Sequence, residues 1–597
     1  MVNPTNTNFF TELNGSSSSF SGLSSGINSK EIISALVQAR RQPAVQLENR
    51  ISENDAQVAA YDELGSLMTN LRSPLEALRG EVGFFAESVF DQKVAGTSSK
   101  ASDTAPVDYQ PVSADEVLGV SVANNAQVGK YEVEVLQLAQ NHQLRSDAIA
   151  NRSASLDSLG IPTGTITVNG KDIVVDADDS LLDVRDKLNA ADADLSATIL
   201  SASDTEHFLV VNGDKTGTSN AVTFGGDAAV LQGLGLTDAG GAVKNELQAV
   251  QDATIRVNGL GVDIVRETNS IDDVIDGVTL DLFGAEEGTE VVIEVANDLQ
   301  SVKDELVNFV EAFNELKSFI EDQRQEKVRG DSDSPEFGPL AFDSTLRTLN
   351  GDINRLVSQT VGGQADGFES LGQVGITMND DFKLEIDDSV LDNRLITNVE
   401  EVRNLFEFSS SSSDSRIRVT NPGTTAVPNT DGAGNEIPYY VNIGGTDADG
   451  NITSANIQYG PGAGAGGVDD GSVEISGRSI KVLEGPAKGL TFTFSGDPNS
   501  GPVEDIELNI NRGVADAMFY SNEKYVSKNG TGSVIENAQN LSSQNQNYLD
   551  RIGDIDARVE IYRQRLVRQF AQMEQAVAQA NSLKESITSS FEAQNKD

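Results

Sequence analysis

Residues 548–580 read YLDRIGDIDARVEIYRQRLVRQFAQMEQAVAQA, and this stretch decides how the rest of the chain is organised. Its apolar residues recur with a 4-3-4-3-4 spacing at Tyr548, Ile552, Ile555, Val559, Tyr562 and Leu566. That heptad spacing is typical of a helix that buries one narrow stripe, its seam, against other helices. The next apolar residue, Phe570, follows Leu566 by four positions instead of three, which is a stutter that locally unwinds a supercoil. We therefore predict one helix over residues 541–591, about 75 Å long, that needs a helical partner.

The sequence offers two partner helices far from this stretch. Residues 43–78 keep heptad spacing, with Leu47, Ile51, Val58 and Tyr61 in the seam. We expect Pro43 to begin this helix, after a shorter helix that Ser29 caps. Residues 302–320 carry a third seam, which includes Leu306, Phe309 and Phe313. Seams at opposite ends of one chain predict an α+β multidomain fold. In it the N- and C-terminal helices form a coiled-coil or bundle stalk, and β-rich head domains are looped out between them.

The polar residue Asn54 also falls at a seam position of the N-terminal helix. A buried Asn in a helical seam fixes the register of the pair at some cost in stability.

Residues 81–300 have the alternating pattern of β-strands and contain an internal repeat. Residues 165–188 and 254–276 each read as a strand, an Asn-Gly turn and a second strand. Asn-Gly between alternating apolar runs is a strong hairpin signal. We expect each copy to end in a short helix, capped by Ser180 in the first and Ser270 in the second. Two copies predict two β-rich lobes in the head.

Changes of composition divide the remaining sequence. Residues 1–28 are rich in Asn, Ser, Thr and Gly and predict a disordered arm. The other predicted segments are the N-terminal stalk helices (29–80), the head (81–300), stalk helices with short strands (301–408), an inserted β-rich domain (409–513) and the C-terminal helices (514–597). We expect mobile linkers at Ser409–Ser413 and Gly460–Gly467.

The composition excludes several classes of function. The chain has 597 residues with 92 acidic and 43 basic side chains, a net charge of −49, so nucleic acid and anionic membranes are not expected partners. It has no Cys and two His, so very few side chains could form a thiolate or histidine metal site or a catalytic triad. No run is apolar enough to span a membrane, and the N-terminus lacks a signal-peptide pattern. We expect no enzyme activity, cofactor, metal or catalytic residue.

Three motifs could indicate a binding site, and each also has an ordinary structural explanation. Residues 447–451 (DADGN) begin like a calcium loop but lack the acid expected at its twelfth position, so we interpret them as a turn. Gly460–Gly467 is glycine-rich without the strand and helix that flank a phosphate loop. Five arginines stand out in the C-terminal helix: Arg551, Arg558, Arg563, Arg565 and Arg568. They either pair with acids of neighbouring helices or form a docking face for another subunit.

Several stretches, in order, resemble the flagellar filament cap (hook-associated protein 2) family. They include GLSSGINSKEIISALVQARRQPAVQLENRI near the N-terminus, LGQVGITMNDDFKLEIDDSVLDNRL (371–395), RGVADAMF (512–519) and IGDIDARVEIYRQRLVRQFAQMEQAVAQANS (552–582). The chain departs from the family in having Phe382 where a glycine is usual. Residues 409–511 are also longer than in compact members, so their role cannot be carried over.

The resemblance implies an extracellular protein at the distal tip of the bacterial flagellum. It would form a homo-oligomeric ring, keep flagellin from leaking and help each flagellin fold and insert. It would leave the cell through the flagellar type III export apparatus without a cleaved signal peptide. Its partners would include flagellin, the hook–filament junction proteins and an export chaperone on the C-terminal helices.

Within the chain, the half of the C-terminal helix after the stutter has no comparable partner. We expect flagellin, neighbouring cap subunits and the chaperone to dock there, on Phe570, Met573, Val577, Leu583 and Ile587. Two alternatives stay open. One is a hook–filament junction protein or flagellin-like subunit, and the other is an adhesin whose β head binds host surface glycans.

Overall fold

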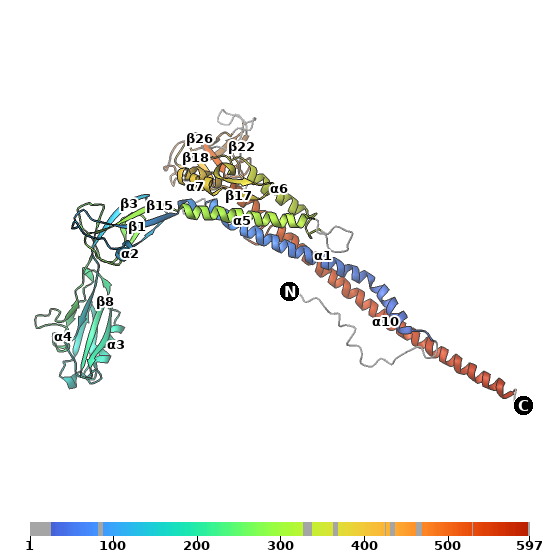
Figure 1. Ribbon diagram of the computed structural model, residues 1–597, viewed down its shortest axis with the longest axis horizontal. Coiled ribbons are helices and arrows are strands. Elements are labelled where there is room, and N and C mark those ends of the chain that lie inside the picture. The colour runs from blue at the N-terminus through green and yellow to red at the C-terminus, as the bar shows by residue number, and fades with distance from the viewer. Residues whose placement is uncertain are drawn as a thin grey trace. The chain divides into compact units, whose positions relative to one another are not determined.

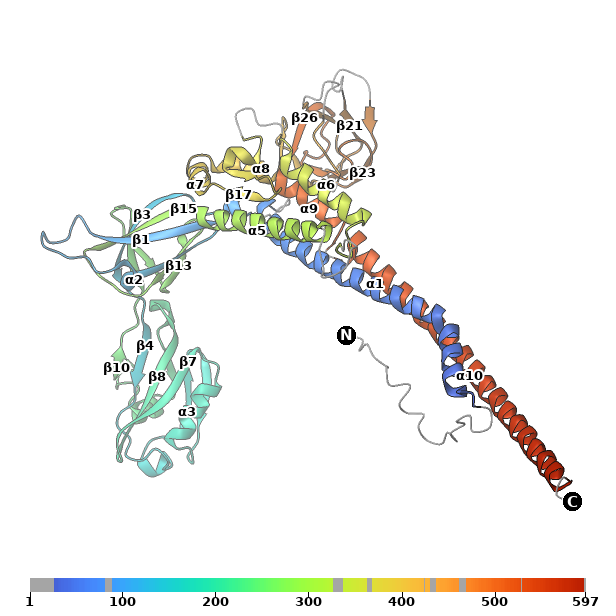
Figure 2. The ribbon, with the colours of Figure 1, turned by 45° about the vertical axis from the view of Figure 1, so that its right-hand side comes forward.

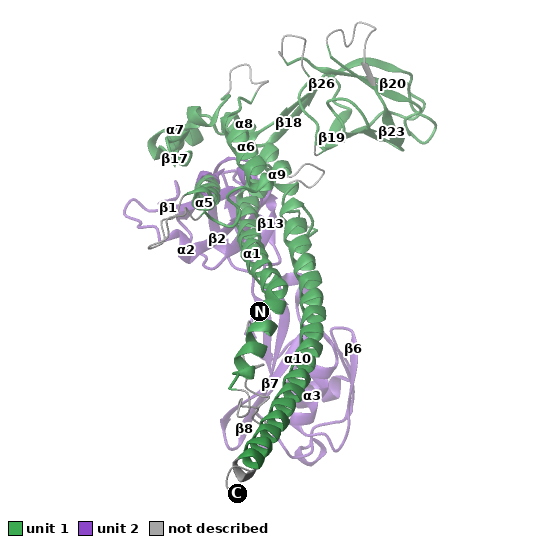
Figure 3. Ribbon diagram, turned by 90° about the vertical axis from the view of Figure 1, so that its right-hand side faces the viewer, with its two compact units in different colours: residues 1–84, 305–597 green, residues 85–304 purple. Residues whose placement is uncertain are grey.

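The computed structural model describes residues 26–80, 88–325, 337–361, 368–423, 425–429, 436–460, 469–527 and 529–594. The predicted arm therefore lies almost entirely outside the described residues, as does most of Gly460–Gly467. The chain divides into two compact units, residues 1–84 with 305–597, and residues 85–304 (Figure 3). None of the described helices is long and apolar enough to cross a membrane. Long helices at both ends with β-sheets between them confirm the predicted α+β class.

Two long helices dominate the first unit, α1 (Ser29–Leu78) and α10 (Ser533–Gln594) (Figure 1). The predicted break at Pro43 is wrong, because α1 continues through both Pro43 and Pro74. Proline removes one backbone hydrogen bond and kinks a helix. Figure 2 shows α1 changing direction in its N-terminal part. The cap is Asn28, whose side chain accepts from the Glu31 amide, and not Ser29.

A group of shorter elements packs near the C-terminal end of α1. These are α5 (Leu299–Arg324), α6 (Ser344–Ser358), the hairpin β16 (Ile376–Met378) and β17 (Leu384–Ile386), α7 (Asp388–Thr397), α8 (Val399–Phe406) and α9 (Val514–Glu523). The strands and helices between residues 376 and 406 agree with the helices and short strands predicted for residues 301–408. Phe382, at the tip of the hairpin, has a φ of +58°, which explains why a glycine would be favoured at this position.

Residues 408–512 form a β-sandwich within the same unit. One sheet has the order β18 (Phe408–Ser412), β26 (Val503–Arg512), β20 (Tyr439–Ile443), β21 (Ala455–Tyr459) and β22 (Asp469–Gly471). The other has the order β19 (Ile417–Asn421), β25 (Thr491–Phe494), β24 (Ser479–Val482) and β23 (Val473–Ser476). Their inward side chains share one core. The linker predicted at Ser409–Ser413 is wrong, because residues 408–412 pair with β26, and ladder hydrogen bonds use the backbone whatever the side chain.

The unit of residues 85–304 contains two hydrophobic cores. The first lies between a five-stranded and a three-stranded sheet. The strands of the former are β1 (Lys93–Ala101), β15 (Thr289–Asn297), β3 (Gly129–Gln137), β11 (Ala253–Val257) and β12 (Ile264–Arg266), and those of the latter are β13 (Ser270–Ile275), β14 (Val278–Leu282) and β2 (Leu118–Val122). The short helix α2 (Ala114–Val117) adds Ala114 and Val117 to this core.

The second core is built from residues inserted between β3 and β11. Its four-stranded sheet is β10 (Glu246–Gln248), β4 (Asn141–Arg145), β8 (Glu206–Thr216) and β7 (Leu195–Ser203), and its three-stranded sheet is β6 (Lys171–Val175), β5 (Gly164–Val168) and β9 (Phe224–Gly226). The helices α3 (Leu181–Ala190) and α4 (Ala228–Leu234) complete it. The first repeat copy lies in this core, and the second copy contributes to the other.

The two repeat copies end differently. Both Asn-Gly turns have positive φ at Asn and Gly, at Asn169-Gly170 and Asn258-Gly259, as hairpins of this type require. In the first copy Ser180 caps α3 as predicted. In the second copy the predicted helix at Ser270 is wrong, because residues 270–275 form strand β13. An Asp276-Gly277 turn follows and pairs β13 with β14, so this turn is the signal that the helix prediction overlooked.

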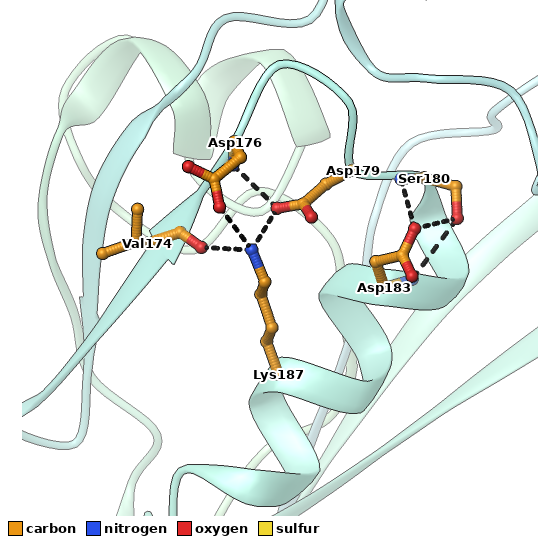
Figure 4. A network of polar contacts seen from close by, with 6 residues as sticks. All are labelled: Val174, Asp176, Asp179, Ser180, Asp183 and Lys187. Atoms are coloured by element: carbon orange, nitrogen blue, oxygen red, sulfur yellow. Dashed lines mark hydrogen bonds and ion pairs between the residues drawn. The ribbon is translucent and has the colours of Figure 1, made fainter.

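Acidic residues around the start of α3 have a structural role (Figure 4). Asp183 and Ser180 form a reciprocal capping box, and the hydrogen bond from Ser180 lowers the pKa of Asp183. The Lys187 ammonium group donates to Asp176 at 2.8 Å and to Asp179 at 2.6 Å. These carboxylates therefore fix the loop before the helix.

Candidate functional site: the paired terminal helices

The helices α1 and α10 run side by side in opposite directions (Figure 2). Their contacts join Arg41 to Asp556, Asn54 to Asn545 and Tyr61 to Asn537, so residue numbers rise along one helix as they fall along the other. A small core of Ala44, Leu47 and Ile552 is completed by Ile51, Tyr548 and Ile555. The structure thus brings the two terminal seams together across about five hundred residues of sequence.

The predicted seam residues differ in burial. Leu47, Tyr61 and Val559 are buried, and Ile51, Val58, Tyr548, Ile555 and Tyr562 are half-buried. Two helices alone leave part of each seam open, which is why five of these eight side chains keep contact with solvent.

The third predicted seam, on α5, contacts other partners. Leu306, Phe309 and Phe313 are fully buried. The Phe309 ring meets that of Phe406 in α8 edge-on, with centroids 6.4 Å apart. The Lys317 ammonium group donates to Asn350 and Asn354 of α6. Among the described residues, these side chains of α5 therefore contact α6 and α8, and Asn314 of the same helix forms hydrogen bonds with the backbone of Leu384 in β17.

Polar contacts cross the seam at two levels. The Asn54 amide donates to Asn545 at 2.8 Å and to Gln544 at 3.0 Å, and Asn545 donates in turn to Asp55. The Arg41 guanidinium group bridges Asp556 and Glu48, and these two acids raise its pKa. Because each bond requires one alignment of the helices, the two levels together set the register.

Sequence reasoning missed a hydrogen-bonded junction of three helices at Tyr61. Its hydroxyl donates to Asp343, the cap of α6, at 2.8 Å and accepts from Asn537 of α10 at 3.2 Å. Asn537 also donates to Thr345. Burial and the bond to Asp343 raise the pKa of Tyr61 to about 12. A tyrosine at a seam position gave a weak hint of this role, because a buried hydroxyl requires a partner.

A second missed feature is the buried charge cluster where α1 ends. The Asp516 carboxylate is fully buried, 3.2 Å from the Arg512 guanidinium group and 3.7 Å from that of Arg79. Burial raises the pKa of Asp516 and lowers that of Arg512. A side chain at Gly513 would place its Cβ 2.2 Å from the backbone of Phe406. The RGVADAMF stretch therefore joins α1, α8 and α9, and the four-residue spacing of Arg512 and Asp516 was its only sequence signal.

The C-terminal part of α10 continues beyond the start of α1. The residue numbers of the three cross-helix contacts add to 597, 599 and 598, so Ser29 lies level with residues 568–570. Phe570, Met573 and Val577 are half-buried, and every described side chain from 578 to 591 is exposed. Leu583 is 64% exposed, Ile587 49% and Phe591 64%. Their spacing of four residues places these three side chains on one face as an apolar stripe.

The other candidate residues that the structure describes have ordinary structural roles. The Asp447 carboxylate accepts the backbone amides of Asp449 and Asn451, which makes residues 447–451 the ordinary turn expected. Among the described residues, no group of three or more His, Asp or Glu side chains could hold a metal ion. Both histidines are buried, with His142 bonded to Glu246 and His207 to Ser201.

Comparisons with known proteins give a consistent result. Residues 250–582 match the family model described as flagellar hook-associated protein 2 C-terminus, and residues 25–142 match that of the N-terminus. The chain is 28% identical over 413 residues to A-type flagellar hook-associated protein 2 of Pseudomonas aeruginosa, covering 65% of this chain and 80% of that protein. It is 28% identical to flagellar hook-associated protein 2 of Escherichia coli K12, covering 61% and 75%.

Solved structures give a further comparison. The D1-D2-D3 domains of the flagellar cap protein FliD from Escherichia coli are 25% identical, with 58% of this chain and 89% of that chain covered and a TM-score of 0.45.

Proposed function

Because the chain belongs to the flagellar hook-associated protein 2 family, we propose that it caps the distal end of a bacterial flagellar filament. In this proposal several copies form a ring outside the cell, keep flagellin from leaking and promote its folding and insertion. The function is non-enzymatic. The observation that carries it beyond family membership is the apolar stripe Leu583–Ile587–Phe591 on the part of α10 that extends past α1.

The stripe is suited to docking on another helix. Exposed apolar patches on this scale mark interaction sites, because leaving them in water is unfavourable. A stripe with four-residue spacing fits a groove between helices of a partner. At the filament end that partner is flagellin, and Phe570, Met573 and Val577 extend the surface toward α1. Before assembly an export chaperone covers the same face.

A position at the distal end of the filament also implies the remaining partners. Export through the flagellar type III apparatus brings the protein to the hook–filament junction proteins, on which the first cap sits before a filament exists. Flagellin then inserts beneath it. The α1–α10 pair, with few large buried side chains, suits legs that must shift at each insertion, because weak packing permits local opening.

Two charges placed in the stripe test the proposal. We expect the double substitution Leu583→Asp and Ile587→Asp to produce cells that have hooks, lack filaments and shed monomeric flagellin into the medium. Both side chains are exposed, so the thermal unfolding midpoint of the purified protein should not change. The matched control is Ser582→Asp with Ser589→Asp, which adds the same charge on another face of the exposed helix. Normal filaments from the stripe variant would refute docking through this face, and normal filaments in a gene deletion would refute capping.

A further inference from the structure

The outer face of α10 carries a basic stripe in a strongly acidic chain. Arg551, Arg558 and Arg565 are spaced by seven residues, and all three are exposed. Ile561 lies between the last two on the same face and is 59% exposed. Residues seven apart stay in line along a helix of a supercoiled pair, so these four side chains form one straight edge.

Within the part of the chain that the structure describes, these three arginines form no ion pair. Arg563, on the flank of the helix, pairs with Glu560 at 2.8 Å. Arg551, Arg558 and Arg565 form no ion pair with any described carboxylate, and Arg558 donates only to the backbone carbonyl of Asp554. The first of the two explanations offered by the sequence, pairing with acids of neighbouring helices, therefore does not apply to them. A docking face is the remaining explanation.

A complementary stripe lies on α1. Glu48, Asp55, Val58 and Asp62 follow one another at intervals of seven, three and four residues. Arg551, Arg558, Ile561 and Arg565 follow one another at the same intervals. Asp55 and Asp62 are exposed and pair with no described cation, and Glu48 is 42% exposed beside Arg41.

A groove lies beside this acidic stripe. It has a volume of about 920 Å³ between α1 and α10, with Val58 and Asp62 in its wall. Its lining includes small residues, among them Gly65, Ser66 and Ser542. Small residues let another helix approach closely, and the apolar Val58 gives an exposed isoleucine a favourable contact.

We propose that the outer face of α10 in one copy of this chain docks on the acidic flank of α1 in a second copy. Arg551 then faces Glu48, Arg558 faces Asp55 and Arg565 faces Asp62, while Ile561 enters the groove at Val58. This register requires the two docked helices to run in the same direction. Because α1 and α10 are antiparallel within each copy, the two copies point in opposite directions.

Because the two copies point in opposite directions, we expect this contact in the free protein, before it assembles into a cap. A cap on one filament end needs all copies to point the same way, so docking of this kind and assembly exclude each other. The pairing therefore keeps the terminal helices occupied by a second copy until assembly. The contact between two copies in solution does not depend on the proposed function, whereas its assignment to the stage before assembly rests on it.

Charge reversal in the full-length protein tests the contact. We expect wild-type protein to self-associate in sedimentation-velocity runs over a concentration series, more weakly at 1 M than at 0.1 M salt because salt screens exposed charges. Arg558→Glu with Arg565→Glu should raise the dissociation constant at least about tenfold, and so should Asp55→Lys with Asp62→Lys. Mixing the two variants should restore association, because each reversed stripe then meets a complementary one.

The control variant makes the same change in net charge at two positions outside the basic and acidic stripes. Lys30→Glu with Lys584→Glu also replaces two exposed cations by acids and should leave association at the wild-type level. Unchanged circular dichroism shows that each variant is folded, and only the Asp55 variant should have a lower thermal midpoint, because it loses the hydrogen bond from Asn545. Wild-type protein that stays monomeric, arginine variants that associate normally, or a mixture that does not recover would each overturn the proposal.

Engineered cysteines test the direction, and the absence of native cysteine makes each crosslink unambiguous. We expect Arg565→Cys protein mixed with Asp62→Cys protein to give a disulfide-linked dimer under mild oxidation. Arg551→Cys with Asp62→Cys should crosslink poorly, because those positions meet only if the two copies run in the same direction. Preferential crosslinking of the second combination would overturn the antiparallel arrangement.

Discussion

Replacing Tyr61 by Phe removes the hydroxyl group that joins α1, α6 and α10 and leaves the ring in place. The hydroxyl donates to the Asp343 carboxylate at 2.8 Å, and the side chain is 4% exposed. Hydrogen bonds to charged groups contribute about 1.5–3 kcal/mol. We expect Tyr61→Phe to lower the free energy of unfolding by about that amount at pH 8, measured by urea denaturation.

The same bond makes a prediction about pH. The pKa of Tyr61 is raised from 10.0 to about 12, so between these values the folded state keeps a proton that the unfolded state releases. Stability from this group is therefore present below pH 10 and falls as the pH rises toward 12. At pH 11, one unit above the unfolded pKa, the loss is about 1.4 kcal/mol. The difference between wild type and Tyr61→Phe should shrink by that amount between pH 8 and pH 11.

Comparison with a second tyrosine isolates the effect. Tyr562→Phe removes the hydroxyl of a half-buried seam residue that makes no hydrogen bond with a described residue, so it controls for the loss of a seam hydroxyl without a carboxylate partner, and its effect at pH 8 should be smaller than that of Tyr61→Phe. Other groups that titrate, such as Tyr525, are present in every variant and cancel in the differences. A gap for Tyr61→Phe that stays constant or widens between pH 8 and pH 11 would refute the reasoning.

Two further predictions concern the domains. Gly513→Ala should destabilise the protein by about 1–3 kcal/mol in thermal or urea unfolding, because the added Cβ would lie 2.2 Å from the Phe406 backbone. An unchanged midpoint would show that α9 can move away from α8, and Gly553→Ala, whose Cβ meets nothing within 4 Å, is the control. Ser180→Ala should cost about 1 kcal/mol through the lost cap of α3, measured by hydrogen exchange of that helix, whereas Asp178→Ala should have little effect. Equal protection in both variants would contradict a capping role.

The sequence was most informative where a pattern is local and physically distinctive. Heptad spacing located α1, α5 and α10, and the Asn-Gly turns located two hairpins. Strand β13, which ends the second repeat, could not be predicted in this way. Ser270 and Asp273 have the spacing of a capping box, yet Asp273 pairs with Arg266 and the Ser270 hydroxyl donates to Asp281. Arg266 lies on β12 and Asp281 on β14, two strands of different sheets, so tertiary contacts override the local preference for a helix.

Contacts of high sequence separation could not be predicted at all. The junction at Tyr61 joins residues 282 and 476 positions away, and the cluster at Asp516 depends on Arg79 from the other end of the chain. Nothing near either residue encodes its partner. The choice of partner for α5 failed for a related reason. Heptad spacing shows that a face is buried but not which helix covers it, and here Phe406 and Asn350 lie against that face instead of α10.

The stutter in α10 lies level with the first residue of α1. Heptad spacing is required only where a second helix must be followed, since it keeps the seam facing that partner. The register of the pair places Ser29, the first residue of α1, level with residues 568–570 of α10. The extra spacing between Leu566 and Phe570 therefore falls where the partner ends. Beyond it Phe570, Met573, Val577 and Ala580 resume a 3-4-3 spacing, and Leu583, Ile587 and Phe591 then follow at intervals of four. The stutter thus lies at the boundary between the part of α10 that pairs with α1 and the part that extends past it.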